Sequence, residues 1–266
     1  MIQATDDVGR VVTLPRPARR IVSLVPSLTE TLFALGCGEA VVGVTRYCTE
    51  PKTEVARLQI VGGTKNPDLA RIEALQPDLV LVNAEENRRE DFECLIAALC
   101  VFVTFTRRVA DVPSLVRRLG ALGGVAAAAE RMAAEIESAV GMMVSDTVSR
   151  PRVFCPIWKN PWMSFNRDTY DDDMLKVAGG ANVCGARMER YPTVTLEEIA
   201  AAQPEVVLLP DEPYVFRPKD LPAFEPLRAT PAFQTNRVHF IDGKALSWYG
   251  ARTAAGLRYL REALTK

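Results

Sequence analysis

Aromatic side chains in polar loops are the feature of this sequence that most directly suggests chemistry. All three tryptophans and four of the six tyrosines follow short apolar runs, in loops that also carry charged residues. Large, flat side chains at a cleft mouth suit a large, flat, partly apolar ligand, and charged neighbours can fix its polar groups. The alternative is that some of these aromatics only cover the ends of a sheet. We predict a ligand-binding site made of Arg46, Tyr47, Lys65, Glu85, Trp158, Trp162, Tyr191, Glu212, Tyr214, Trp248, Tyr249 and Arg252.

Motifs for catalysis and for metal binding are missing from the sequence. The only histidine, His239, lies in a predicted strand, where a packed side chain is the simpler interpretation. A Ser/His/Asp triad would need this histidine, and the sequence has no GxSxG, GxGxxG or GxxxxGKS/T pattern. Zinc sites built on two or more histidines are excluded. We predict a protein that is not an enzyme, with no catalytic residue, no metal site and no cofactor of its own.

Acidic and sulfur-containing residues have simpler structural interpretations than metal binding. Asp171, Asp172 and Asp173 precede a predicted helix, where carboxylates stabilise the helix dipole and cap free backbone N–H groups. The six cysteines form no CxxC pair and no zinc-type spacing. Their apolar neighbours indicate buried free thiols, although an even count also permits disulfides.

The composition indicates a folded globular protein without a polyanionic partner. Hydrophobic residues make up 48% of the chain, and 32 basic residues balance 33 acidic ones, for a net charge of −1. Nucleic acid is therefore not an expected partner. No apolar stretch reaches the ~20 residues that span a membrane. No signal peptide is visible, so we expect either a mature form with an added Met1 or a protein made for the cytoplasm.

An internal repeat indicates two similar lobes. Residues 69–82 match residues 196–209 at a constant offset (196 − 69 = 127). Each copy has a short helix, a Gln-Pro stop and a continuous apolar run, which is typical of a strand buried on both faces. A looser match pairs residues 20–22 with residues 152–154.

A long amphipathic helix lies between the two copies. Apolar residues recur every three or four positions, and glycines and Pro151 punctuate the ends, so we predict a helix over residues 124–146. Elsewhere strands alternate with helices, which predicts mostly parallel sheets with binding loops at the carboxyl ends of the strands. The predicted fold is α/β, with two Rossmann-like lobes joined by a long backbone helix. We place an N-terminal lobe at residues 1–108, the connecting segment at 109–148 and a C-terminal lobe at 149–266.

Residues 20–30, 43–48 and 71–80, together with the long joining helix, carry a family resemblance. They resemble the class III substrate-binding proteins of ABC importers, the helical-backbone receptors for vitamin B12, ferric siderophores and haem. Within that family the sequence is most similar to the cobalamin-binding branch. Tyr47 and Tyr191 stand where that branch has a cobalamin-contacting tyrosine and tryptophan. The departures are Thr64-Lys65 and Asn83-Ala84, at positions where that branch can carry tryptophans.

The resemblance implies a monomeric receptor that binds a cobalamin-like corrinoid or another metal chelate between its lobes. It would deliver this small-molecule ligand to the permease dimer of an ABC importer. The implied compartment is the periplasm, with the cytoplasm as the alternative. The functional alternatives are a ferric-siderophore or haem receptor of the same fold, and an intracellular cobalamin-handling protein or sensor.

Family members dock on the permease through one carboxylate per lobe, and the matching positions here are Glu30 and Glu197. Ser27 and Glu30 are also spaced as a capping box, as are Thr195 and Glu198. Glu30 therefore has a second interpretation as a capping residue. Glu197 does not, because Glu198 takes that role.

Overall fold

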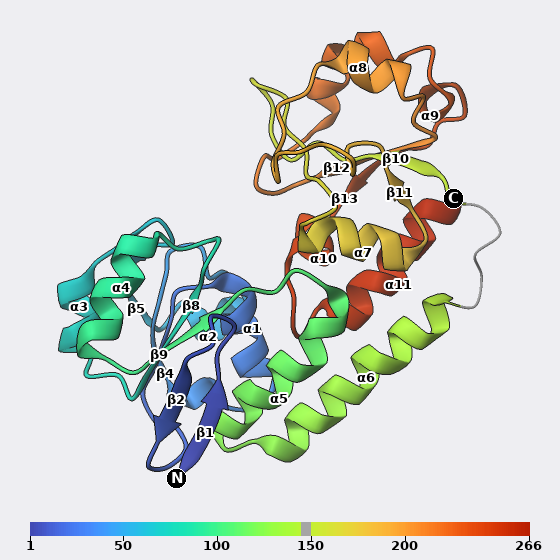
Figure 1. The fold of residues 1–266 in the computed structure, drawn as a ribbon. Coiled ribbons are helices and arrows are strands. Elements are labelled where there is room, and N and C mark those ends of the chain that lie inside the picture. Colours follow the sequence, from blue (N-terminus) through green and yellow to red (C-terminus); the bar gives the residue numbers. More distant parts are fainter. Residues whose placement is uncertain (145–149) are drawn as a thin grey trace. The chain divides into compact units, whose positions relative to one another are not determined.

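The computed structural model describes residues 1–144 and 150–266, which form two compact units (Figure 1). Unit 1 comprises Met1–Thr106, Ala110–Glu137 and Tyr249–Ala251. Unit 2 comprises Arg107–Val109, Arg252–Lys266 and the described part of Ser138–Trp248. The lobe boundary that we predict at residue 108 stays a prediction, and the one at residue 148 lies outside the described residues.

Unit 1 is built on a five-stranded parallel sheet. The strand order is β5-β4-β3-β8-β9, and every neighbouring pair is parallel, as predicted from the alternation of strands and helices. The apolar strands are buried over almost their whole length, as expected for a parallel sheet that is covered on both faces. The strands are β3 (Ile21–Ser23), β4 (Val41–Val44), β5 (Gln59–Ile60), β8 (Leu79–Asn83) and β9 (Val101–Thr104).

Two antiparallel hairpins and several helices complete unit 1. One hairpin joins β1 (Ile2–Thr5) to β2 (Val11–Leu14), and a small one joins β6 (Gly62–Gly63) to β7 (Asn66–Pro67). The helices are α1 (Pro26–Ala34), α2 (Lys52–Val55), α3 (Leu69–Ala74), α4 (Arg89–Ala98) and α5 (Val112–Gly123), with a short 3-10 turn η1 (Gly38–Ala40).

Unit 2 has a four-stranded parallel sheet in the order β11-β10-β12-β13. Its strands are β10 (Arg152–Phe154), β11 (Ala181–Asn182), β12 (Val206–Pro210) and β13 (Val238–Ile241). Its helices are α7 (Tyr170–Ala178), α8 (Leu196–Ala201), α9 (Pro231–Gln234), α10 (Gly243–Ser247) and α11 (Thr253–Thr265), with the 3-10 segment η3 (Pro218–Leu227). A further 3-10 turn, η2 (Val109–Asp111), lies where the chain passes from unit 2 to unit 1.

The internal repeat is confirmed. The strand order β4-β3-β8-β9 of unit 1 recurs as β11-β10-β12-β13 in unit 2, and β5 is an addition to unit 1. Gln76 and Gln203 both adopt left-handed backbone angles, with φ of +46° and +50°. Arg20 Nε donates to the carbonyl of Leu75 at 3.0 Å, and Arg152 Nε donates to that of Gln203 at 2.8 Å. Each arginine therefore satisfies a carbonyl at the end of the helix that leads into the central strand.

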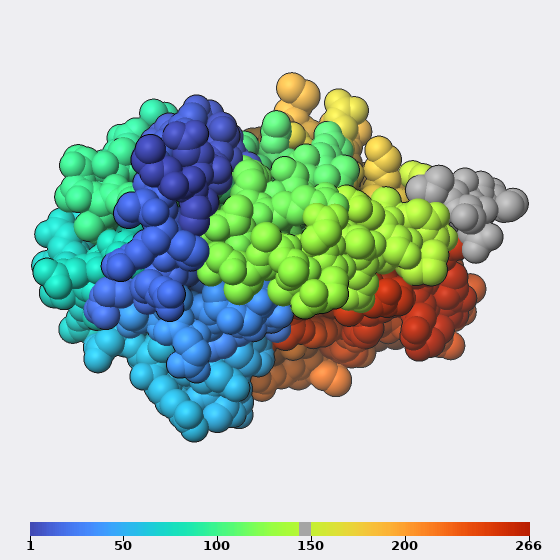
Figure 2. Space-filling view, turned by 90° about the horizontal axis from the view of Figure 1, so that it is seen from below, coloured from blue at the N-terminus to red at the C-terminus, as the bar shows by residue number. Residues whose placement is uncertain are grey.

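The long helix is α6 (Ala126–Val144), and it confirms the predicted amphipathic stripe. Ala129, Ala133, Ile136 and Met143 are buried, while much of the rest of the helix lies on the surface (Figure 2). The helix starts two residues later than predicted, because Gly124 is the left-handed end of α5, which we did not predict. The predicted end of the helix, at residue 146, lies outside the described residues.

One predicted capping box is wrong and the other is confirmed. Helix α1 begins at Pro26, with Val25 as the N-cap residue and no side-chain capping bond, so Ser27 lies inside the first turn. Proline is well suited to this position because its missing N–H would have no helical partner. In α8, Glu198 N donates to Thr195 Oγ1 at 3.2 Å and Thr195 N donates to Glu198 Oε2 at 3.2 Å, which is the predicted box.

The three acids at the start of α7 behave as predicted, but buried thiols are confirmed for only four of the six cysteines, because Cys94 is exposed and Cys100 is half-buried. The three acids lie in the first turn of α7, behind the N-cap Thr169. Asp172 accepts from Asn182 Nδ2 at 2.8 Å, and Asp173 accepts from Val109 N at 2.8 Å. All six cysteines are free thiols. In the described part of the chain, no helix is long and apolar enough to cross a membrane.

Candidate ligand-binding site

Arg46 and Tyr47 form an exposed pair in unit 1, in the loop that follows β4. The Tyr47 side chain is 54% exposed. A Cβ atom on Gly63 would lie 3.3 Å from Tyr47 Cε2 and 3.6 Å from Arg46 Nε, so both side chains lie against the β6–β7 hairpin at this glycine. The absence of a side chain at position 63 avoids a clash with Asn66 Oδ1, the nearest atom, and leaves room for the tyrosine ring.

Lys65 and Glu85, also predicted site residues, meet in the same unit. Lys65 Nζ donates to the backbone carbonyl of Glu85 at 2.6 Å. The loop that carries Glu85 is held by Asn83, whose Oδ1 accepts from Glu85 N at 2.8 Å and from Glu86 N at 3.1 Å. Asn87 Nδ2 then donates to the carbonyl of Thr64 at 2.9 Å, which links this loop to the β6–β7 turn. At the positions where the resemblance allows tryptophans, this chain has a hydrogen-bonded group of Lys65, Asn83, Glu85 and Asn87, which we call the polar platform.

Tyr249 belongs to unit 1, but its side chain is buried, with only 5% exposed. Its hydroxyl accepts from Asn83 Nδ2 at 2.9 Å and lies 3.4 Å from Thr104 Oγ1. Burial raises the pKa of the Tyr249 phenol well above its ordinary value, so the group stays neutral. Tyr249 is thus an interior residue of unit 1, and a direct ligand contact by its side chain stays a prediction.

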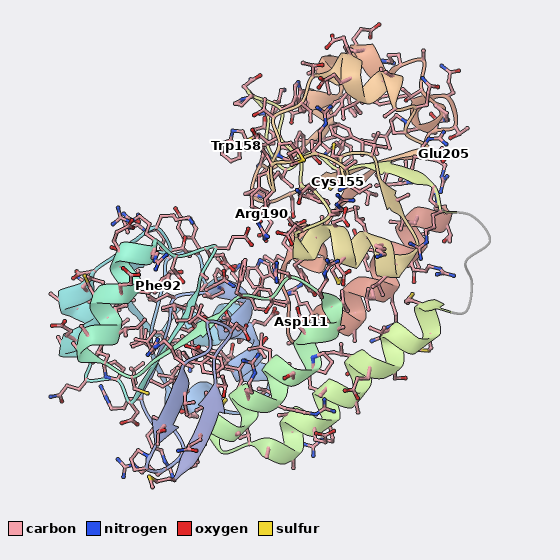
Figure 3. The ribbon with its side chains drawn as sticks, viewed as in Figure 1. Phe92, Asp111, Cys155, Trp158, Arg190 and Glu205 are labelled. Atoms are coloured by element: carbon pink, nitrogen blue, oxygen red, sulfur yellow. The ribbon has the colours of Figure 1, made fainter. Side chains whose placement is uncertain are left out.

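Trp158 and Tyr214 form an aromatic pair in unit 2. Trp158 is 42% exposed and points away from the strands of unit 2, whereas Cys155 lies among them (Figure 3). The Trp158 ring meets the Tyr214 ring edge-on, with 5.9 Å between centroids and 75° between planes. Trp162 is different, because it stacks on Phe216 at 6.1 Å and packs on Phe224 at 4.8 Å. Its ring therefore joins the core of unit 2, while Trp158 keeps an exposed face.

Trp248, Glu212 and Arg252 gather where the chain leaves β12 and β13. Trp248 is only 8% exposed, and its ring has Lys244 Nζ at 5.2 Å and Arg252 Cζ at 5.5 Å, both within cation–π range. Arg252 also pairs with Asp242 at 3.4 Å. Burial raises the pKa of the Glu212 carboxyl, and a hydrogen bond from Trp248 offsets this only in part. Lys244 and Asp242 were not among the predicted residues, although they directly follow a predicted strand.

Tyr191 lies half-buried in the loop between β11 and α8. The loop is held from within unit 2, because Asn166 Nδ2 donates to the carbonyl of Arg187 at 3.0 Å. Next to Tyr191, Arg190 (labelled in Figure 3) pairs with Asp168. The predicted residues thus form separate groups, each within one unit: Arg46 with Tyr47, Lys65 with Glu85, Trp158 with Tyr214, and Glu212 with Trp248 and Arg252. Among the described residues there is no group of three His, Cys, Asp or Glu that could hold a metal ion.

Parallel α/β units with candidate binding residues after their strands are typical of receptors that bind small molecules. The chain matches the family model described as "Periplasmic binding protein" over residues 21–245, and it therefore belongs to this family. Its members and structural neighbours are substrate-binding proteins of ABC importers rather than enzymes, and their two α/β lobes are those of class III receptors.

Three relatives illustrate the range of the family. The vitamin B12-binding protein of Pectobacterium carotovorum is 25% identical over 200 residues, which cover 73% of this chain and 72% of the relative. An uncharacterized ABC transporter substrate-binding lipoprotein of Bacillus subtilis, YvrC, is 26% identical over 264 residues, which cover 95% of this chain and 82% of the relative. The periplasmic haem-binding protein RhuT from Roseiflexus, in its apo structure, is 28% identical with a TM-score of 0.82. The match covers 93% of this chain and 98% of that one.

Proposed function

We propose that this substrate-binding protein delivers a cobalamin-like corrinoid to its ABC importer. The observation that carries the proposal is one broad exposed aromatic ring on each unit, Tyr47 on unit 1 and Trp158 on unit 2. A flat macrocycle can bury apolar surface by stacking on a ring of this kind. The relatives named vitamin B12-binding protein support the same ligand class.

The charges around the other predicted contacts favour amide groups over carboxylates on the ligand. Glu212 and Asp242 lie beside Trp248, and Glu85 lies in the polar platform of unit 1. Two of the predicted cations already have partners, since Arg252 pairs with Asp242 and Lys65 donates to a carbonyl. Corrin side chains are neutral amides that donate and accept hydrogen bonds, whereas porphyrin propionates are anions that these carboxylates would repel.

A haem receptor is the second candidate, and Tyr47 is the observation that favours it. A tyrosine phenolate is one of the side chains that ligate haem iron. Tyr47 is exposed, with the Arg46 side chain beside it. The likeness to the Roseiflexus haem-binding protein supports this candidate too.

We place the protein outside the cytoplasm, where its relatives are periplasmic proteins or lipoproteins. For the contact with the permease dimer we propose the carboxylates Glu30 and Glu197, and we expect the receptor to act as a monomer. Glu197 is exposed on α8 and Glu30 is half-buried on α1. The capping box at Ser27 does not form, so Glu30 is not a capping residue of α1.

Parallel titrations with cyanocobalamin and haemin test the ligand. Quenching of tryptophan fluorescence, corrected for ligand absorbance, should show saturable binding of cyanocobalamin at micromolar affinity or tighter. Trp158→Ala should weaken this binding by about tenfold, which is the scale of losing one aromatic stacking partner. Phe240→Ala is the matched control, because Phe240 is similarly exposed, at 41%, but lies within β13.

Tyr47→Phe separates the two candidates. It keeps the ring, so corrinoid binding by stacking should persist, but it removes the oxygen that would ligate haem iron. Loss of haemin binding in Tyr47→Phe, with no binding of cyanocobalamin to the wild type, would replace the corrinoid proposal by the haem one. Failure of both ligands to bind would refute both.

A further inference from the structure

Three residues from the C-terminal part of the chain, Tyr249–Ala251, are built into unit 1. We call this segment the strap. The residues on either side of it, Trp248 and Arg252, belong to unit 2 and are predicted ligand contacts. The chain therefore leaves unit 2 after one candidate site residue and returns to it at another. Anchoring the strap restrains the backbone of both residues, because they are covalently next to it.

The strap is anchored on α1 through Thr31. Thr31 Oγ1 accepts from Ala251 N at 3.1 Å and donates to the carbonyl of Ser27 at 2.7 Å. Between the two anchored residues, Gly250 adopts a φ of +96°, and a Cβ atom there would overlap with Thr31 Oγ1. Only glycine fits this position, so the close approach of the strap to α1 is specified by the sequence.

The second anchor is the buried hydrogen bond between Asn83 and Tyr249. Asn83 Nδ2 donates to Tyr249 Oη at 2.9 Å and to Thr104 Oγ1 at 3.2 Å. The Oδ1 atom of the same amide accepts from the backbone N–H groups of Glu85 and Glu86. The backbone N–H of Asn83 donates to Asn87 Oδ1 at 2.8 Å. One buried amide thus holds the strap with its nitrogen and residues 85–86 with its oxygen.

We infer that Asn83 and Tyr249 are positioning residues that couple residues 85–86 of unit 1 to Trp248 and Arg252 through the strap. The inference rests on the proposed function, because it takes Glu85, Trp248 and Arg252 as ligand contacts. The Asn83 amide orients the strap and residues 85–86 together. If the amide rotates and breaks its hydrogen bond to Tyr249, its oxygen also moves away from the N–H groups of Glu85 and Glu86. Residues 85–86 and the strap would then be ordered together before the ligand binds, which lowers the ordering cost of binding.

Tyr249→Phe and Thr104→Val form a matched pair of variants. Each removes one hydroxyl acceptor of Asn83 Nδ2. Thr104→Val also removes the 3.4 Å contact between Thr104 Oγ1 and Tyr249 Oη, but only Tyr249→Phe breaks the direct hydrogen bond between Asn83 and the strap. Both are near-isosteric, and their thermal unfolding should confirm that both fold. Three measurements compare them with the wild type: the 19F NMR spectrum of 5-fluorotryptophan-labelled protein, hydrogen exchange of the Glu85 and Glu86 amides, and cyanocobalamin affinity. Trp158→Phe and Trp248→Phe assign the fluorine resonances.

In Tyr249→Phe, we expect the Trp248 resonance to shift, the two amides to exchange faster and the affinity to fall about tenfold, the effect of losing one hydrogen bond in a buried network. Thr104→Val should leave the Trp248 resonance and the affinity close to wild type. An unmoved Trp248 resonance in Tyr249→Phe, or equal effects of the two variants, would overturn the coupling. Shifted spectra with unchanged affinity would overturn the positioning role. If the wild type binds no cyanocobalamin, the proposed function fails, while the two ligand-free measurements still decide whether the strap couples the loops.

Discussion

Burial separates the predicted aromatic residues into two kinds. Tyr47 and Trp158 keep exposed rings, whereas Tyr249 is buried in unit 1 and Trp162 is half-buried against the core of unit 2. The sequence pattern predicts that all four lie in loops after strands, and this was sufficient to identify them as candidate ligand contacts. It could not separate them, because the partners that bury Trp162 and Tyr249 are Phe216, Phe224 and Asn83, which lie far away along the chain. Loop residues show no periodicity from which such contacts can be read.

Glu212 is a second residue whose character depends on distant neighbours. Burial raises the pKa of its carboxyl above the ordinary glutamate value, despite the hydrogen bond from Trp248. A raised pKa in the folded state means that the folded protein binds a proton more tightly than the unfolded chain. Stability is therefore lost as the pH rises from the ordinary glutamate pKa through the raised one.

Glu212→Gln should accordingly stabilise the protein above this pH window and have little effect below it. We expect a gain of roughly 1–2 kcal/mol at pH 8, on the scale of a buried polar group relieved of its desolvation penalty. Urea unfolding of wild type and variant at pH 4 and pH 8 measures the difference. Glu225→Gln serves as the control, since Glu225 is exposed on η3. A gain from Glu212→Gln that is the same at both pH values would contradict the assignment.

At the scale of elements, the repeat was the most informative feature of the sequence. The Gln-Pro stops predicted where α3 and α8 end, and the left-handed Gln76 and Gln203 confirm that the stop is the same in both copies. Helix α5 was not predicted, although Leu115, Leu119 and Leu122 have helical spacing and Gly124 ends the helix. The start of α1 was misjudged because the SxxE pattern competes with Pro26, which occupies the first helical turn.

Two glycines offer opposite tests of how these elements are packed. Gly250→Ala should destabilise the protein by roughly 2–4 kcal/mol, because it combines a positive φ with a clash against Thr31. Gly141→Ala should stabilise it by about 0.5–1 kcal/mol, since Gly141 lies in α6 and a Cβ atom there would meet no other atom within 4 Å. Urea unfolding followed by circular dichroism measures both. Equal effects of the two substitutions would mean that the strap does not pack as described.

At the scale of the whole molecule, the repeat bears on how the receptor meets its importer. Glu197 on α8 corresponds in the repeat to Ala70 on α3 (197 − 127 = 70), whereas Glu30 lies on α1. The two proposed docking carboxylates therefore do not occupy equivalent positions of the two units. A permease dimer presents the same surface twice, so equivalent positions would be the simplest way to meet it. Each carboxylate thus has to be tested alone.

Charge reversal at each site tests this docking, with the cognate importer reconstituted in liposomes and its ATPase stimulation as the readout. Glu197→Arg and Glu30→Arg should each raise the receptor concentration for half-maximal stimulation by about tenfold, the effect of replacing an attractive charge pair by a repulsive one. Ligand affinity should not change, and Glu225→Arg should stimulate like the wild type. If Glu197→Arg weakens the stimulation and Glu30→Arg leaves it unchanged, docking on unit 1 does not use Glu30. In that case Ala70→Glu should strengthen the stimulation, because it restores the symmetry of the repeat. If Ala70→Glu has no such effect, unit 1 meets the permease without a carboxylate on α1 or α3.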